Sequence, residues 1–207
     1  MNNDELNEIL DKRLPQLGIS ITPDARWKIV TLSRGLPEYV HALGRDAAIE
    51  ALKMRTKKIE EMHVDAAISE LLIHSNQSAN TAYKKAIHSN KTNALYRQVL
   101  LACAIAKTDD EGKFTLKSLI EPLNKILKRK LEIAGFQSHV AAFCGKDRGN
   151  ILERTGTPRA YKYRFRDPKM QPYVLMQGIN HGDIRTDGLS ILSAPEQPNL
   201  FPQELLE

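Results

Sequence analysis

The spacing of apolar residues changes from one period to another near residue 150, and this change limits the folds open to the chain. In the first part, apolar residues recur at three- and four-residue steps, as in Leu6, Ile9 and Leu10, which is the spacing of one helix face. From Ala160 to Arg166, rings and cations alternate, which is the two-residue period of a strand with one buried face. The sequence therefore predicts a mostly α-helical fold with one β-hairpin late in the chain.

Residues 1–74 have the pattern of a small bundle of four short helices. Thr22-Pro23 supplies a cap and a first helical residue for the second helix, and Leu36-Pro37 marks the start of the third. We expect Asp65 to open the fourth helix. Residues 75–91 are polar and rich in Ser and Asn, and are predicted to be a connecting helix and linker.

Residues 92–182 have the element order of a winged helix-turn-helix. A helix over 92–107 is followed by Phe114, which we expect to bridge to a sheet, and then by a second helix. A helix over 133–146 precedes a hairpin that turns at residues 155–158, Thr-Gly-Thr-Pro. In a winged helix-turn-helix, the helix before the hairpin enters the DNA major groove, and the hairpin contacts phosphate or the minor groove.

The end of the chain is expected to pack on this module and then to leave it. Gln171–Ile179 is predicted to be a helix that packs back on the winged helix. Residues 183–207 contain three prolines and are net acidic, so we predict a tail that contacts protein partners.

Several classes of protein are disfavoured by composition. No apolar run approaches the roughly 18 residues of a membrane span, so we expect no membrane partner and a cytoplasmic location. Cys103 and Cys144 lack a CxxC spacing and are predicted to be buried free thiols. The six histidines are scattered without HExxH or ligand spacing, so we expect no metal site and no catalytic residue.

The positive charge is concentrated in the middle of the chain. Residues 1–90 carry 12 cations and 12 carboxylates, residues 91–166 carry 16 and 7, and residues 167–207 carry 2 and 6. A basic block of this kind is the electrostatic pattern of a polyanion-binding surface. We therefore expect DNA as a partner.

A resemblance to a known family rests on two short stretches. Ser33-Arg34-Gly35-Leu36-Pro37-Glu38 opens a predicted helix and resembles the second-sensor region of the lid domains of AAA+ ATPases. Asp4–Leu14 resembles the first lid helix of those enzymes, whose lids are also four-helix bundles. A winged helix directly after the lid is similar to origin-recognition initiator ATPases and Holliday-junction branch-migration motors. The resemblance covers roughly residues 4–180.

This resemblance implies a lid that senses nucleotide and a winged helix that holds DNA, so that nucleotide state is coupled to the grip on DNA. The chain has no G-x-x-x-x-G-K-[ST] motif, so ATP and magnesium would belong to an ATPase core upstream of Met1, and we expect no ATPase activity from this chain alone. Glu38 stands where the resemblance places a sensor arginine, and a carboxylate there would repel phosphate. The nucleotide-sensing candidates are Arg34, Gly35, Pro37, Glu38 and Arg45.

The DNA-binding candidates come from three parts of the predicted winged helix. They are Gln137, Ser138 and Lys146 on the helix before the hairpin, Arg148, Arg154, Thr157, Arg159 and Lys162 along the wing, and Lys125, Lys128, Arg129 and Lys130 at the end of the preceding helix.

Other interpretations of the same residues stay open. Cations at a helix C-terminus also stabilise the helix dipole, and alternating cations protect an exposed strand from edge pairing. The chain is alternatively a winged-helix transcription regulator with dimerising N-terminal helices, or a winged helix that binds protein.

Overall fold

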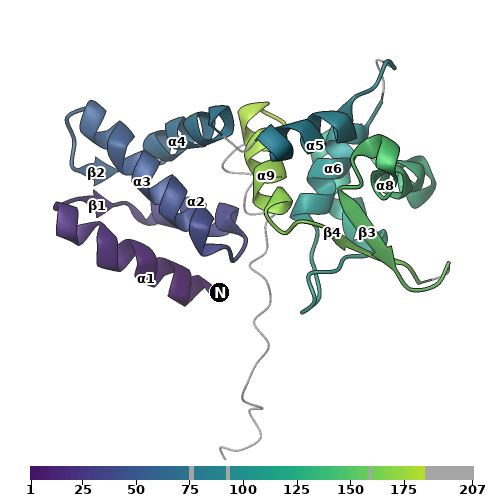
Figure 1. The fold of residues 1–207 in the computed structure, drawn as a ribbon, viewed down its shortest axis with the longest axis horizontal. Coiled ribbons are helices and arrows are strands. Elements are labelled where there is room, and N and C mark those ends of the chain that lie inside the picture. The colour runs from purple at the N-terminus through teal and green to yellow at the C-terminus, as the bar shows by residue number, and fades with distance from the viewer. Residues whose placement is uncertain (75–76, 92–93, 159, 185–207) are drawn as a thin grey trace, which may run out of the picture.

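The computed structural model describes residues 1–74, 77–91, 94–158 and 160–184. The predicted mostly α-helical fold is confirmed: these residues form nine α-helices, one antiparallel hairpin and one short parallel strand pair. Helices α1–α4 form an N-terminal bundle at one end of the molecule, α5–α8 and the hairpin form the other end, and α9 lies between them (Figure 1). Of the predicted tail, residues 183–207, everything from residue 185 onward lies outside the described residues.

The N-terminal bundle follows from its caps and its small buried residues. Helix α1 spans Asn3–Arg13, α2 Pro23–Ser33, α3 Pro37–Lys53 and α4 Glu61–Ile73. The predicted cap of α2 is confirmed, because the Thr22 hydroxyl oxygen accepts the Ala25 N–H at 3.3 Å. Ala47, Ala48 and Ala51 of α3 are buried, so the neighbouring helices can approach it closely.

The predicted start of the fourth helix is wrong. Helix α4 begins at Glu61, four residues before Asp65, because the His63 ring accepts the backbone N–H of Glu60 at 2.9 Å and closes the first turn. Asp65 instead lies within the helix and pairs with Lys28 at 2.7 Å. A parallel pair, β1 (Ser20–Ile21) with β2 (Lys58–Ile59), also joins this bundle and was not predicted, since two residues are too few to show alternation.

The C-terminal half begins with the connecting helix α5 (Gln77–Ile87) and contains α6 (Tyr96–Ile105), α7 (Ile120–Leu127) and α8 (Gln137–Phe143). Strands β3 (Leu152–Thr155) and β4 (Lys162–Phe165) form the predicted hairpin. The predicted bridge is confirmed, because Phe114 and Tyr163 exchange two backbone hydrogen bonds of 2.8 Å.

The predicted continuous helix over 133–146 is broken into three pieces. A 3₁₀ turn spans Ile133–Gly135, α8 follows, and a second 3₁₀ turn spans Lys146–Arg148. Gly145 is extended, with φ −96° and ψ 154°, so α8 cannot continue into Lys146. Helix α7 is also shorter than expected: Lys128 adopts the left-handed conformation that ends it, and Arg129 and Lys130 lie beyond its last turn.

Helix α9 (Met170–Asn180) joins the two ends of the molecule. It packs against α6, as predicted, but also against α2 and α4 of the bundle. Four consecutive residues of α9, Tyr173, Val174, Leu175 and Met176, are buried. A helix that packs on one side only would leave some of four consecutive residues exposed. In the part of the chain that is described, no helix combines the length and apolar character needed to cross a membrane.

Candidate functional site

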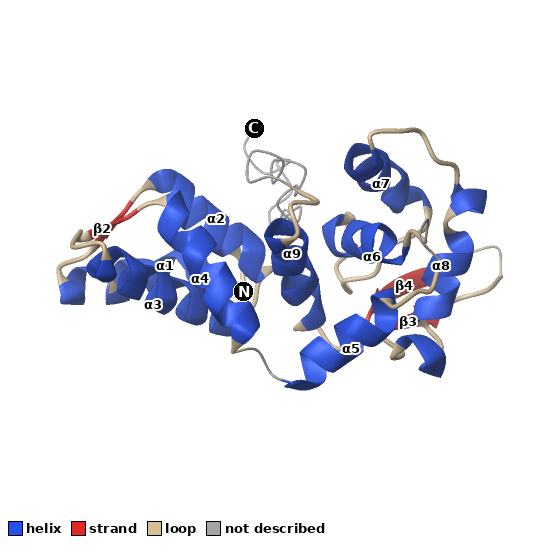
Figure 2. Cartoon of the chain, turned by 90° about the horizontal axis from the view of Figure 1, so that it is seen from above, coloured by secondary structure: helices blue, strands red, loops and turns tan. Residues whose placement is uncertain are grey.

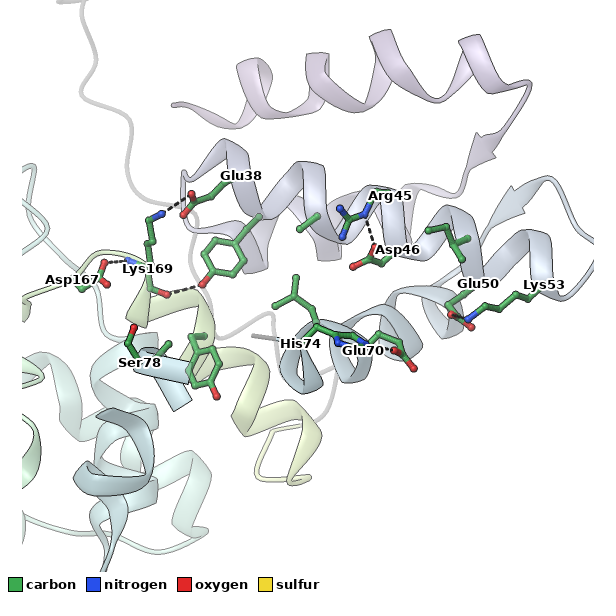
Figure 3. A pocket seen from close by; sticks show the side chains of 16 residues that line it. Glu38, Arg45, Asp46, Glu50, Lys53, Glu70, His74, Ser78, Asp167 and Lys169 are labelled. Atoms are coloured by element: carbon green, nitrogen blue, oxygen red, sulfur yellow. Dashed lines mark hydrogen bonds and ion pairs between the residues drawn. The ribbon is translucent and has the colours of Figure 1, made fainter. Parts of the chain in front are cut away.

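Two separate surfaces, a central cleft and a basic face, each bring together some of the predicted site residues. The central cleft has a volume of about 520 Å³ and lies between α3, α4 and the start of α9 (Figure 3). One face of α3 lines it from Glu38 to Lys53, and Lys169 and Tyr173 close it from the C-terminal half.

Glu38 makes the main polar contact across this cleft. Its carboxylate pairs with the Lys169 ammonium at 2.8 Å, and both side chains are about half exposed, at 48% and 60%. Beside it the Tyr39 hydroxyl donates to the backbone oxygen of Lys169 at 2.9 Å (Figure 3). Burial, followed by the charge of Glu38, raises the pKa of Tyr39, so the hydroxyl stays a donor. The expected repulsion at Glu38 is thus met by a cation of this chain, Lys169, which the sequence analysis missed.

The other nucleotide-sensing candidates do not converge on Glu38. Arg45 lines the cleft but is paired with Asp46 at 2.7 Å. Arg34 ends α2 in the left-handed conformation, is partly buried, and has its pKa lowered by that burial. The backbone oxygen of Gly35 accepts a hydrogen bond from the N-terminal ammonium of Met1 at 3.1 Å, and neither Gly35 nor Pro37 lines the cleft.

The charges of the central cleft do not fit a nucleotide triphosphate. Its lining includes more carboxylates than cations, and its three cations are all paired: Arg45 with Asp46 at 2.7 Å, Lys53 with Glu50 at 2.6 Å and Lys169 with Glu38 at 2.8 Å. A phosphate entering this cleft would have to displace a carboxylate from each cation it used. Among the described residues, no cluster of His, Cys, Asp and Glu is arranged to hold a metal ion.

The basic face is centred on the end of α7. Lys117, Lys125, Lys128, Arg129 and Lys130 line an open groove of about 610 Å³, called here the α7 groove. Of these five, only Lys125 forms an ion pair within the described chain, with Glu121 at 2.7 Å. Asn124 fixes the chain that follows by accepting the Leu131 N–H at 2.7 Å. Lys117 was missed because it lies in a separate 3₁₀ turn, eight residues before Lys125.

Helix α8 presents few of the predicted DNA-binding side chains to solvent. Gln137 and Ser138 are exposed in its first turn, and Lys146 is exposed beyond its end. Arg148 is not available, because its guanidinium lies 3.6 Å from the centre of the Tyr96 ring and donates to the backbone oxygens of Ala86 and His88. Arg148 therefore fastens the end of α5 to the turn after α8.

The cations of the hairpin are mostly engaged with neighbouring side chains. Arg154 stacks on Tyr161 at 4.2 Å, and Lys162 pairs with Asp109 at 2.7 Å. The Lys162 ammonium, followed by the N–H of Lys113, lowers the pKa of Asp109. Thr157 is exposed at the turn, and Arg159 lies outside the described residues. Helix α6 separates the hairpin from α7 (Figure 2), so the structure divides the predicted DNA-binding residues into two groups.

Comparisons of the chain with protein families, with curated proteins and with solved structures find no match.

Proposed function

We propose that this chain binds nucleic acid through the α7 groove and its surroundings, as the C-terminal lid and winged-helix part of an AAA+ family ATPase. The observation that carries the proposal is that Lys128, Arg129 and Lys130 are exposed together and form no ion pair within the described residues. Neighbouring cations repel one another, so such a cluster binds a polyanion more readily than paired cations do.

The element order supports a winged helix-turn-helix. Helices α6, α7 and α8 are followed by the β3–β4 hairpin, and Phe114 adds a one-residue third strand to it. Helices α1–α4 would be the lid. Nucleotide, if the chain responds to it, would be held by an upstream core, because the central cleft does not have the charges to hold it.

The short α8 favours binding to the nucleic-acid backbone over reading of bases. With seven residues, it offers only Gln137 and Ser138 at its start as side chains that recognise base edges. Contacts from the α7 groove would go to phosphates, which carry no sequence information. We therefore expect similar affinity for duplexes of different sequence.

The test is duplex binding at several salt concentrations with a charge-reversed variant. Lys128→Glu, Arg129→Glu and Lys130→Glu together are expected to weaken binding by roughly 100-fold and to reduce the slope of log affinity against log salt by about 2 to 3. Fluorescence anisotropy with a labelled duplex measures both quantities.

The N-terminal bundle offers a matched control. Arg55, Lys57 and Lys58 are also one arginine and two lysines, all exposed, and their reversal changes net charge equally. If both triple variants lose the same affinity, the binding is only a response to net charge and the proposed surface is wrong. If neither variant weakens binding, the alternative that the winged helix binds protein is favoured.

A further inference from the structure

An apolar groove on the N-terminal bundle lies outside both surfaces described above. It lies between α1 and α3, has a volume of about 230 Å³, and is called here the bundle groove. Its floor includes Leu10, Leu14 and Val40, all buried, and its edges include Ile49 and Leu52, which are 44% and 51% exposed. The volume is below the roughly 300–1,000 Å³ of typical small-molecule sites, and suits a few apolar side chains of a peptide better.

The charged side chains that line the bundle groove are two arginines, Arg13 and Arg45, of which Arg45 is paired with Asp46 at 2.7 Å. Arg13, His41 and Arg45 are the titratable residues that line it, and no carboxylate does. Arg13 is exposed and forms no ion pair within the described chain. A segment that fits this groove would therefore carry apolar side chains next to carboxylates.

Residues 185–207 of this chain have that composition. They carry four carboxylates against one cation, and Leu200, Phe201, Leu205 and Leu206 fall within seven residues, interleaved with Glu204. The 15 residues 185–199, between Ile184 and Leu200, can span up to about 50 Å. Because the segment and the groove belong to one chain, the effective concentration of the segment at the groove would be in the millimolar range.

We propose that the segment Leu200–Leu206 docks in the bundle groove, with its apolar side chains between α1 and α3 and Glu204 near Arg13. This inference does not depend on nucleic-acid binding. The α7 groove also attracts an acidic segment, but its lining contains one apolar side chain, Ile120, and so offers no place for four apolar side chains.

The test uses methyl NMR spectra of the whole chain, with signals from Ile9, Ile19, Ile49 and Leu52 reporting on the bundle groove. Leu200→Ser with Phe201→Ser is expected to shift these signals, and a control of Asn199→Ser with Gln203→Ser is expected to leave them in place. Adding a peptide of residues 196–207 to the Leu200→Ser, Phe201→Ser variant is expected to restore the original positions. Adding Leu52→Glu to that variant is expected to lower its affinity for the peptide by at least tenfold.

Three results would overturn the proposal. If the methyl signals of the groove keep their positions in the Leu200→Ser, Phe201→Ser variant, the segment does not dock there. Signals that move with protein concentration would assign the groove to a second copy of the chain. Displacement of the peptide by duplex DNA, with loss of binding in 0.5 M salt, would assign the segment to the α7 groove instead, because surface electrostatic contacts are screened by salt.

Discussion

Lys28 in the N-terminal bundle and the cations at the end of α7 in the C-terminal half are held in opposite ways. In the N-terminal bundle, Lys28 of α2 is fully buried, and its ammonium lies 2.7 Å from Asp65 and 3.5 Å from Glu61 of α4. In the C-terminal half, Lys128 and Arg129 are exposed at the end of α7 without an ion pair inside the described chain. Lys28 joins two helices of the bundle, whereas Lys128 and Arg129 stay accessible to the nucleic acid that we propose as a ligand.

This difference shows why counting charges locates a binding surface only coarsely. The residues from 91 to 166 have an excess of cations, but several of them serve the fold. Arg148 fastens α5 to the turn after α8, and Lys162 fastens the hairpin to Asp109. Once these two cations are set aside, five of the remaining cations of residues 91–166 line the α7 groove.

The largest effect is expected where a cation is part of the core. Lys28→Ala is expected to lower the unfolding free energy by about 2–4 kcal/mol, because it removes a buried side chain and leaves a cavity. Lys28→Met keeps the aliphatic stem, and Asp65 and Glu61 are exposed enough to regain water, so its cost is expected to be much smaller. Chemical denaturation of both variants measures the difference. Equal losses would show that the ion pair, and not the packing, stabilises the bundle.

Packing around two glycines gives a second comparison of the halves. A Cβ on Gly178 of α9 would lie 2.6 Å and 2.9 Å from the two methyl carbons of Leu101 and 3.3 Å from its Cγ, so Gly178→Ala is expected to cost about 1–3 kcal/mol. A Cβ on Gly44 of α3 would meet one methyl carbon of Leu10 at 2.8 Å, which can turn aside. Gly44→Ala is therefore expected to be nearly neutral, with the better helix propensity of alanine offsetting the contact. Thermal unfolding of both variants checks this order.

The sequence predicted those features of the fold that depend on local chemistry. The cap at Thr22 and the start of α3 at Pro37 follow from residues close together in the chain, whereas the Phe114 bridge to Tyr163 follows from the element order of a winged helix. The boundaries of α4 and α8 were missed because they depend on a histidine ring that acts as a cap and on an extended glycine, neither of which has a strong sequence signal.

Pairings between distant residues were the part of the site that the sequence did not reveal. Glu38 and Lys169 are 131 residues apart, and Arg148 and Ala86 are 62 apart. No periodicity links such positions, so Arg148 was grouped with the DNA-binding candidates and Lys169 was not considered. The packing of α9 against both halves was missed for a similar reason. A helix that is apolar on all sides does not indicate which surfaces cover it.

A pH dependence is expected from the C-terminal half. The His139 ring lies 4.6 Å from that of Tyr96, and burial, followed by the charge of Arg148, lowers its pKa below the ordinary 6.5. The folded chain then holds a neutral ring, while the unfolded chain takes up a proton as the pH falls below about 6.5. Stability is expected to be full above that pH and to be lost as the pH falls toward the folded-state pKa.

Two histidine variants isolate this contribution. His139→Gln is expected to flatten the fall in unfolding free energy between pH 7.5 and pH 5.5, because the group with the depressed pKa is gone. His88→Gln, at an exposed position of the same half, is expected to leave the fall unchanged. A profile that is equally steep in the His139→Gln variant would assign the pH dependence to other groups.

The smallest effect is expected at the ion pair that joins the two halves. Glu38 and Lys169 are about half exposed, and such pairs contribute roughly 0.2–1 kcal/mol. In a double-mutant cycle with Glu38→Gln and Lys169→Met, the coupling energy is expected to fall in that range and to shrink in high salt. A coupling of 2 kcal/mol or more would mean that this pair, rather than the buried face of α9, sets how the bundle meets the basic half. A small coupling energy would mean that the apolar contacts of Tyr173, Val174 and Met176, which are buried, hold the bundle against the basic half. Salt does not screen such contacts, because they carry no charge.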